Sequence, residues 1–188
     1  MNRGALALAL CLGLAAAPAL GQATSALRGH NSNAPVDVNA DRIEVQDRAD
    51  RAVFSGNVHV VQGDMTLDAA RLTVAYLNGA GSPQIQRLDA SGGVTVRSPS
   101  ETANGSFGIY DLNRRLITLL GGVTLIQGQN QVHGGRLVID MNTGRATVDG
   151  SAVGGGTAGV SGRGGRVSGR FTVPQRTTPA TPAPPPAQ

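Results

Sequence analysis

The chain has 188 residues, a formal net charge of +4 and a single cysteine, Cys11. Residues 151–188 contain four arginines and no acidic residue, whereas residues 36–150 contain ten arginines and twelve acidic residues. This distribution argues against a nucleic-acid-binding surface on the central region, because the excess positive charge lies in the tail. With so few cysteines, an apolar core rather than disulfides must stabilise the domain.

Residues 1–23 have the pattern of a secretory signal peptide. Arg3 precedes an apolar run from Ala5 to Ala17, and small residues follow, with cleavage points after Gly21 or Ala23. The apolar run is too short to cross a bilayer, which takes about 20 residues, and no later stretch approaches that length. We therefore expect an exported, soluble chain.

From residue 36 onward, apolar and polar residues alternate within short segments, and turn residues separate these segments. This pattern predicts β-strands and almost no helix. A strand is expected over residues 41–46, a turn over 47–50, and a longer strand over 51–62. The Gly63-Asp64 pair then predicts a hairpin turn.

One apolar pattern occurs twice. Residues 56–63 read GNVHVVQG and residues 121–128 read GGVTLIQG, and the two copies stand 65 residues apart. Weaker copies begin at Gly92 and Gly150. Repeated strands of this kind indicate a stacked β architecture.

The apolar residues change from odd to even positions between Ala69 and Leu72. A strand cannot change phase in this way without a bulge or a bend. The corresponding pair in the second copy is Gly134-Gly135, so both copies are expected to bend at the same place. We predict an all-β fold, an elongated open β-jelly-roll or sandwich of repeated antiparallel strands.

The alternation also predicts which side chains face the interior, and nearly all of them are aliphatic. Fourteen of them form the candidate site: Phe54, Val58, Val60, Leu67, Leu72, Val74, Phe107, Ile109, Leu119, Val123, Leu125, Val132, Leu137 and Ile139. Six more complete the expected interior: Ile43, Val45, Leu88, Val94, Val96 and Ile117. The sequence is compatible both with a packed core and with an incompletely filled apolar groove.

The domain is expected to span residues 34–153. Residues 154–188 are rich in glycine and then in proline, which predicts a flexible, mostly disordered tail. A short edge strand is expected within residues 166–173, before Pro174 ends it.

The sequence gives little support for a catalytic function. The three histidines, His30, His59 and His133, lack a second ligand at a spacing that defines a metal site, and no serine lies in a nucleophile-elbow pattern. His59 is expected on the outward face of its strand. We therefore predict no enzyme activity, no catalytic residue, no metal and no cofactor.

Several segments together carry a family likeness. Residues 36–41, 54–58 and 62–72, followed by the second copy over 120–137, resemble the OstA-like domain of lipopolysaccharide-transport proteins. The likeness spans about residues 34 to 150 and departs from the family mainly in the tail.

The resemblance implies a β-jelly-roll whose interior shields the acyl chains of lipid A, with the fourteen inward residues as lipid contacts. It implies lipopolysaccharide as the ligand, a periplasmic location and end-to-end homo-oligomers. It also implies contacts with OstA-like domains of an inner-membrane complex and an outer-membrane translocon, and no nucleic-acid partner. Two alternatives remain open: a secreted structural or adhesive β-repeat protein, and the membrane-anchored partner that carries the same domain.

Overall fold

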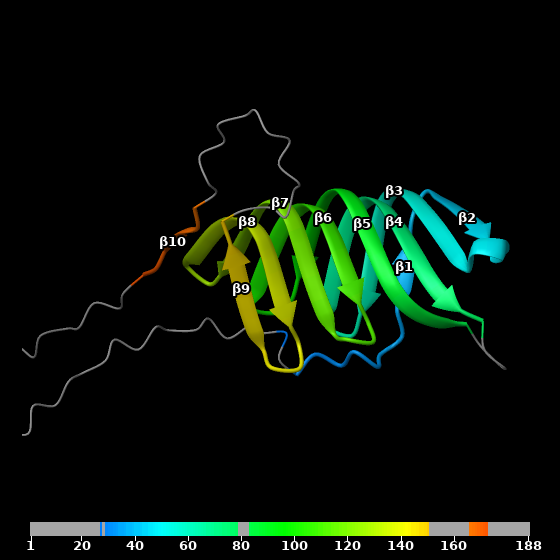
Figure 1. Ribbon diagram of the computed structural model, residues 1–188, viewed down its shortest axis with the longest axis horizontal. Coiled ribbons are helices and arrows are strands. Elements are labelled where there is room, and N and C mark those ends of the chain that lie inside the picture. Colours follow the sequence, from blue (N-terminus) through cyan, green and yellow to red (C-terminus); the bar gives the residue numbers. More distant parts are fainter. Residues whose placement is uncertain (1–26, 28, 79–82, 151–165, 173–188) are drawn as a thin grey trace, which may run out of the picture.

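The computed structural model describes residues 27, 29–78, 83–150 and 166–172 (Figure 1). Within these residues the chain forms a single 10-stranded antiparallel sheet, in which most strands pair with their neighbours in sequence. The expected all-β fold is confirmed. The elements are β1 (Asp37–Asn39), β2 (Arg42–Gln46), the short 3-10 helix η1 (Asp47–Ala49), β3 (Arg51–Gln62), β4 (Met65–Leu77), β5 (Gln84–Arg97), β6 (Glu101–Asp111), β7 (Leu116–Gln127), β8 (Asn130–Asp140), β9 (Arg145–Asp149) and β10 (Ser168–Arg170).

Each long strand bends near its middle, and the bends form one line across the sheet. The pairing register shifts at each of these places: 55/58 in β3, 68/71 in β4, 91/94 in β5, 104/107 in β6 and 120/123 in β7. Figure 1 shows the ribbons curving over along one long edge of the molecule. The sheet is therefore folded on itself, and the hairpin turns lie on the opposite side, which we call the open side.

The line of bends divides the sheet into two half-sheets that face each other. The first half-sheet consists of β2, β9 and residues 51–55, 71–77, 84–91, 107–111, 116–120 and 136–140. The second consists of β1, β10 and residues 58–62, 65–69, 94–97, 101–104, 123–127 and 130–134.

The glycines of the sequence repeat are explained by the bends. Gly56, Gly92 and Gly121 have φ of +80°, +85° and +82°, a region that side chains with a Cβ rarely adopt. A Cβ at Gly92 would also lie 2.6 Å from the Cβ of Ala70 on the neighbouring strand, and one at Gly121 would lie 2.8 Å from that of Ser106. The bends at Gly92 and Gly121 therefore combine a positive φ with a close contact to the neighbouring strand.

The predicted change of face in β4 is confirmed. Leu67 and Ala69 are buried before the bend, and Leu72 and Val74 are buried after it. The register shift lies between Asp68 and Arg71, so the bulge keeps the apolar side chains inward on both half-sheets. The bend predicted in the second copy is also present, because β7 and β8 change register between pairs 120/136 and 123/134.

Strand pairing aligns the inward side chains in rows that run along the whole sheet, which we call the interior rows. Two rows lie on the first half-sheet and one on the second: Ile43, Phe54, Leu72, Ala90, Gly108, Leu119, Leu137 and Val148; Val45, Ala52, Val74, Leu88, Tyr110, Ile117, Ile139 and Ala146; and Val38, Val60, Leu67, Val96, Ala103, Leu125, Val132 and Gly169.

The interior is packed. Leu72, Leu119, Leu137 and Ile139 are each 0% exposed, so no gap that admits a water molecule lies beside them. Burying one such side chain contributes about 1.5–3 kcal/mol. Of the two possibilities that the sequence allows, the structure therefore shows the packed core and not an unfilled groove.

The ends of the chain lie largely outside the described residues. Residues 1–23, for which a signal peptide is predicted, are among those not described, as is most of the tail over 154–188. The edge strand expected within residues 166–173 is present as β10, which pairs with β8. No helix in the described part of the chain has the length and apolarity needed to cross a membrane.

Substitutions at two adjacent glycines test the bend. Gly121 and Gly122 both have positive φ, but a Cβ at Gly122 would meet nothing within 4 Å. We expect Gly122→Ala to lower the free energy of unfolding by about 1 kcal/mol and Gly121→Ala by about 3 kcal/mol, because only the latter adds a steric clash.

Denaturant unfolding of the full chain measures both values. Adding Ser106→Gly to Gly121→Ala removes the clash and should recover part of the loss. Equal losses for the two single variants would show that close strand packing does not shape the bend.

Candidate functional site

The candidate site is the interior between the two half-sheets, and the structure brings most of the predicted residues together there. Ten of the fourteen belong to the buried core, with at most 5% exposure: Val58, Val60, Leu67, Leu72, Val74, Leu119, Val123, Leu125, Leu137 and Ile139. Phe54 and Val132 also stand in interior rows but are only partly buried. Whether these residues contact lipid stays a prediction.

Two predicted residues do not face the interior. Phe107 is 55% exposed, and Ile109 pairs with Asp89 on the outward face. Their neighbours Gly108 and Tyr110 point inward instead. A Cβ at Gly108 would already lie 3.0 Å from Leu119 and Val94 atoms, so the interior has no room there for a larger side chain. The prediction of Phe107 and Ile109 as inward residues was therefore wrong.

Two further residues of the expected interior are exposed to solvent. Ile43 and Val45 stand in interior rows through their pairing with Phe54 and Ala52, yet they are 56% and 57% exposed. Their exposure corrects the expectation of burial. The reason is their position on the edge strand β2, which pairs only with β3 among the described residues. The interior rows therefore reach the end of the molecule and are open there.

The outward face of the second half-sheet is polar. His59 lies 2.6 Å from the Asp68 carboxylate through Nδ1, and Arg97 donates to the same carboxylate. Partial burial acts to raise the pKa of Asp68, but the hydrogen bonds from His59 and Arg97 outweigh it and lower the pKa below its ordinary value. The predicted outward orientation of His59 is confirmed, since its side chain is 45% exposed.

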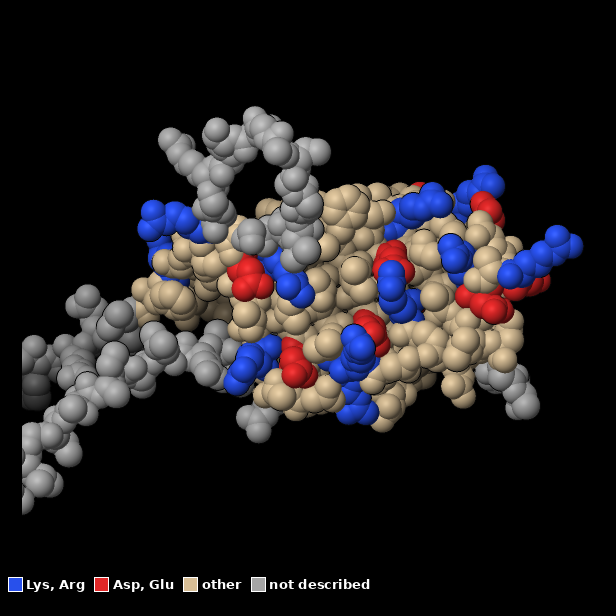
Figure 2. All heavy atoms as spheres, viewed as in Figure 1, with Lys and Arg blue, Asp and Glu red and all other residues tan. Residues whose placement is uncertain are grey.

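Charges of both signs are mixed over the exterior. Figure 2 shows arginines and acidic residues interspersed across one face of the sheet. On the first half-sheet Arg87 lies 2.7 Å from Asp89. This hydrogen bond and the charge of Asp89 raise the pKa of Arg87. The outside is therefore hydrated, while the inside is almost entirely apolar.

The open side carries a polar cluster that sequence reasoning missed. Gln62 is 1% exposed, and its amide nitrogen donates to the backbone oxygens of Ser32 and Ala34 at 3.0 Å each. Its amide oxygen accepts from the Tyr110 hydroxyl at 2.9 Å. Burial raises the pKa of Tyr110, so this hydroxyl remains a donor. Gln62 thus joins the end of β3 on one half-sheet to β6 on the other.

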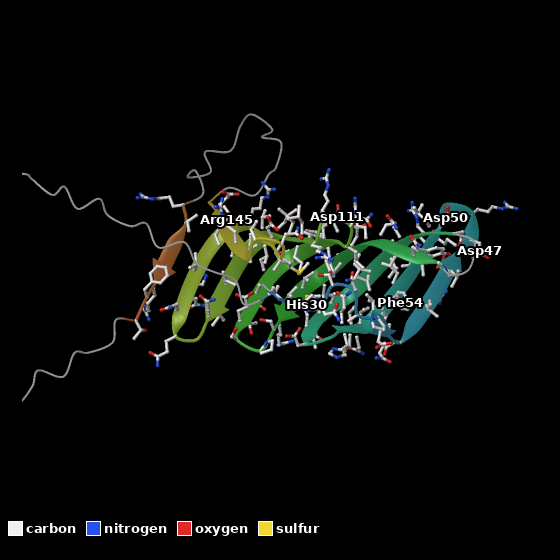
Figure 3. The ribbon with its side chains drawn as sticks, turned by 90° about the horizontal axis from the view of Figure 1, so that it is seen from below. His30, Asp47, Asp50, Phe54, Asp111 and Arg145 are labelled. Atoms are coloured by element: carbon white, nitrogen blue, oxygen red, sulfur yellow. The ribbon has the colours of Figure 1, made fainter. Side chains whose placement is uncertain are left out.

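His30 completes the cluster. Its side chain is 0% exposed, with Nδ1 2.9 Å from the Asp64 carboxylate and Nε2 3.2 Å from the Gln62 amide oxygen. Both ring nitrogens of His30 therefore face acceptor oxygens. In Figure 3, which views the molecule from the open side, His30 lies near the middle of its length. The available sequence signal was a glutamine directly before the Gly63 turn, which alone does not indicate burial.

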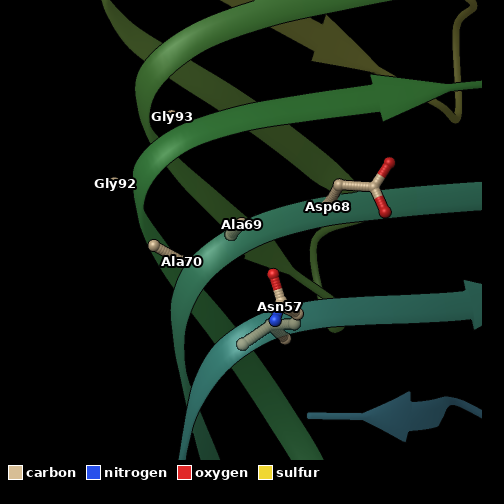
Figure 4. Close-up of a pocket in the computed structure, with 7 residues that line it drawn as sticks. Asn57, Asp68, Ala69, Ala70, Gly92 and Gly93 are labelled. Carbon is tan, nitrogen blue, oxygen red and sulfur yellow. The ribbon is translucent and has the colours of Figure 1, made fainter. Parts of the chain in front are cut away.

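Two hollows on the described part of the chain are lined mainly by small and polar side chains. One of about 420 Å³ lies at the bend and is lined by Asn57, Val58, residues 68–70 and residues 92–93 (Figure 4). Another of about 600 Å³ lies between two turns, at residues 98–102 and 126–128. Among the described residues no group of three or more His, Cys, Asp or Glu side chains could hold a metal ion.

Taken together, these features define a class of protein: a bent antiparallel sheet with a polar exterior and an apolar interior that reaches the end of the sheet. Such an interior suits a long apolar chain better than a compact polar molecule, because it offers aliphatic surface along one direction and few hydrogen-bonding groups.

Comparison with known proteins identifies the family. Residues 37–145 match the family described as "LptA/(LptD N-terminal domain) LPS transport protein". An uncharacterized protein from Rhizobium meliloti (strain 1021) is 39% identical over 145 residues, which cover 72% of this chain and 78% of that protein. The chain belongs to the LptA/LptD N-terminal domain family of lipopolysaccharide-transport proteins, as the OstA-like resemblance predicted.

A solved structure has the same fold. LptH from Pseudomonas aeruginosa, described as the LptA homologous periplasmic component of the conserved lipopolysaccharide transport device, matches with a TM-score of 0.64 at 21% identity. The match covers 76% of this chain and 98% of LptH. The predicted open jelly-roll is therefore confirmed as an LptA-like fold.

The hydrogen bonds to the Asp68 carboxylate make a pH-dependent contribution to stability. Because the pKa of Asp68 is lower in the folded state than its ordinary value of 3.8, its contribution is present above that value and is lost as the pH falls below it. We expect Asp68→Asn to reduce the free energy of unfolding near neutral pH by up to about 1 kcal/mol, and this difference should shrink below about pH 4.

Chemical denaturation of both proteins between pH 7 and pH 2 measures the difference. Arg97→Gln removes one cation and keeps the Asp68 carboxylate. We expect the difference in the free energy of unfolding between the wild type and this variant also to shrink at acid pH, but to be smaller. A difference between the wild type and Asp68→Asn that does not vary with pH would contradict the assignment.

Proposed function

We propose that this protein carries lipopolysaccharide through the periplasm, with the acyl chains of lipid A held between the two half-sheets. The observation that carries the proposal is the set of interior rows, which run along the whole sheet and end in the exposed Ile43 and Val45. The family match supports transport of this lipid. The predicted signal peptide, together with the description of LptH as a periplasmic component, supports the location.

The energetics favour such a carrier. Transfer of an acyl chain of about a dozen carbons from a membrane into water costs on the order of 10 kcal/mol, at roughly 0.8 kcal/mol per methylene. Contact with Leu, Ile and Val side chains offsets this cost. Because the interior rows are chemically uniform, they offer an acyl chain few preferred stopping points, which suits passage along the sheet.

Uptake of lipid requires the half-sheets to separate, because the interior is filled by its own side chains. Leu72, Leu119 and Leu137 have no accessible surface in this closed form. The bends join the half-sheets along one side, so we infer that separation takes place on the open side. The acyl chains then replace contacts between the half-sheets, while the sugars stay in water at the open side.

The two ends of the sheet are candidate contact surfaces. The edge strands β2 and β9 each have one unpaired side among the described residues, and β2 presents the exposed Ile43 and Val45. Strand addition with apolar contact would stack one copy on the next. We propose the same contacts with OstA-like domains of the inner-membrane complex and the outer-membrane translocon.

Site-specific photo-crosslinking tests the proposed function. A photoreactive residue replaces Val58, which is 2% exposed and inward, Phe54, which is inward and partly exposed, or His59, which is outward. We expect adducts with endogenous lipopolysaccharide at Val58 and Phe54, and none at His59. Phe54 serves as a second inward position that tolerates a bulky probe.

The outcome separates transport from the structural alternative. If folded, exported protein gives no adduct at either inward position, the interior acts only as a packed core. In that case the structural or adhesive β-repeat function would be favoured.

A further inference from the structure

The N-terminal segment of the described chain runs across the open side. We call residue 27 together with residues 29–34 the strap. Leu27 is 2% exposed and belongs to the buried core, although it lies ahead of every strand of the sheet. In Figure 1 the strap runs along the lower edge of the molecule, on the side opposite the bends. It therefore lies where the two half-sheets would separate.

Specific contacts hold the strap against the sheet. Gln62 donates to the oxygens of Ser32 and Ala34, and His30 lies against Gln62 and Asp64. The strap also lies close to the turn at Gly63, where a Cβ would be in ordinary contact with His30 Cε1 at 3.7 Å and with the Ala34 Cβ at 3.8 Å. The strap forms no strand, and its own backbone hydrogen bonds are short-range turns such as Ser32 to His30.

The same cluster links the strap to both half-sheets. Gln62 stands at the end of β3 on the second half-sheet, and the Tyr110 hydroxyl that bonds to it belongs to β6 on the first. Each amide hydrogen of Gln62 is used by the strap, and its oxygen accepts from both Tyr110 and His30. Release of the strap therefore removes partners from the group that joins the half-sheets on the open side.

We propose that the strap is a built-in closure of the lipid-binding interior, and that it must leave the open side before an acyl chain can enter. The inference rests on the proposed function. In the closed form Leu27 occupies apolar space that an acyl chain would take. Because the strap contributes no strand to the sheet, it can detach while the sheet keeps its ten strands.

Closure of this kind has a consequence for binding. If only the fraction of molecules with a released strap can take up lipid, the apparent affinity is reduced by that fraction. Weakening the strap raises this fraction and leaves the lipid contacts unchanged. A strap that only stabilises the fold would have no such effect, so uptake distinguishes the two roles.

Two substitutions on the strap itself provide the test. Leu27→Asp removes the apolar anchor, and His30→Ala removes the contacts to Asp64 and Gln62. Neither alters a strand. Thr95→Val is the matched control, because it removes a side-chain hydrogen bond of the second half-sheet, from Thr95 to Asn104, away from the strap.

The measurement is stopped-flow binding of fluorescently labelled lipid A to the full exported chain, with folding checked by circular dichroism. We expect both strap variants to take up the lipid about tenfold faster and Thr95→Val to match the wild type. Hydrogen exchange at Ser32 and Ala34 should accelerate in the strap variants and on addition of lipid A to the wild type.

Failure of the closure and failure of the proposed function give different results. Uptake at the wild-type rate in both folded strap variants would overturn the closure while leaving transport intact. Absence of lipid A binding in the wild type and in every variant would overturn the proposed function, and the closure with it.

Discussion

The burial of one apolar face of a single bent sheet against itself is the interaction on which the rest of the structure depends. A sheet of this length buries its apolar side chains only if every long strand turns at the same place, and the glycine positions of the repeat allow that turn. Gly92 and Gly121 combine positive φ with contacts that leave no room for a Cβ. The change of apolar phase at each bulge then keeps the interior rows continuous across both half-sheets.

Under the proposed function, this packed core is also the binding site for acyl chains. The interior rows leave no accessible surface on Leu119 or Ile139, so an acyl chain can enter only by replacing contacts between the half-sheets. The bends limit that separation to the open side, where Gln62, Tyr110 and His30 form the polar cluster beneath the strap. The exposed Ile43 and Val45 leave the interior rows open at one end of the sheet, which fits the proposed passage of lipid between stacked copies.

Much of the fold could be predicted from the sequence because strand periodicity is a local property. The bounds of β3, the turn at Gly63 and the bend at Ala69-Ala70 all follow from neighbouring residues. The inward face of the second half of β6 was mispredicted, because the bulge between Asn104 and Phe107 moves the buried positions from odd to even numbers. Gly108 and Tyr110 then face inward, although Phe107 and Ile109 are the more apolar pair. The burial of Gln62 and Leu27 depends on contacts between distant segments, such as Gln62 with Tyr110, which no local pattern reveals.

The most direct test of the account is the distance between the two half-sheets with and without lipid A. Spin labels at cysteines replacing Arg114 and Gln129 report across the open side, because these residues lie in turns at opposite ends of β7. A pair replacing Arg51 and Arg145 lies within the first half-sheet and serves as the control. The account predicts that lipid A lengthens only the Arg114–Gln129 distance, as measured by electron double resonance. Lipid A that binds without lengthening that distance would contradict uptake between the half-sheets.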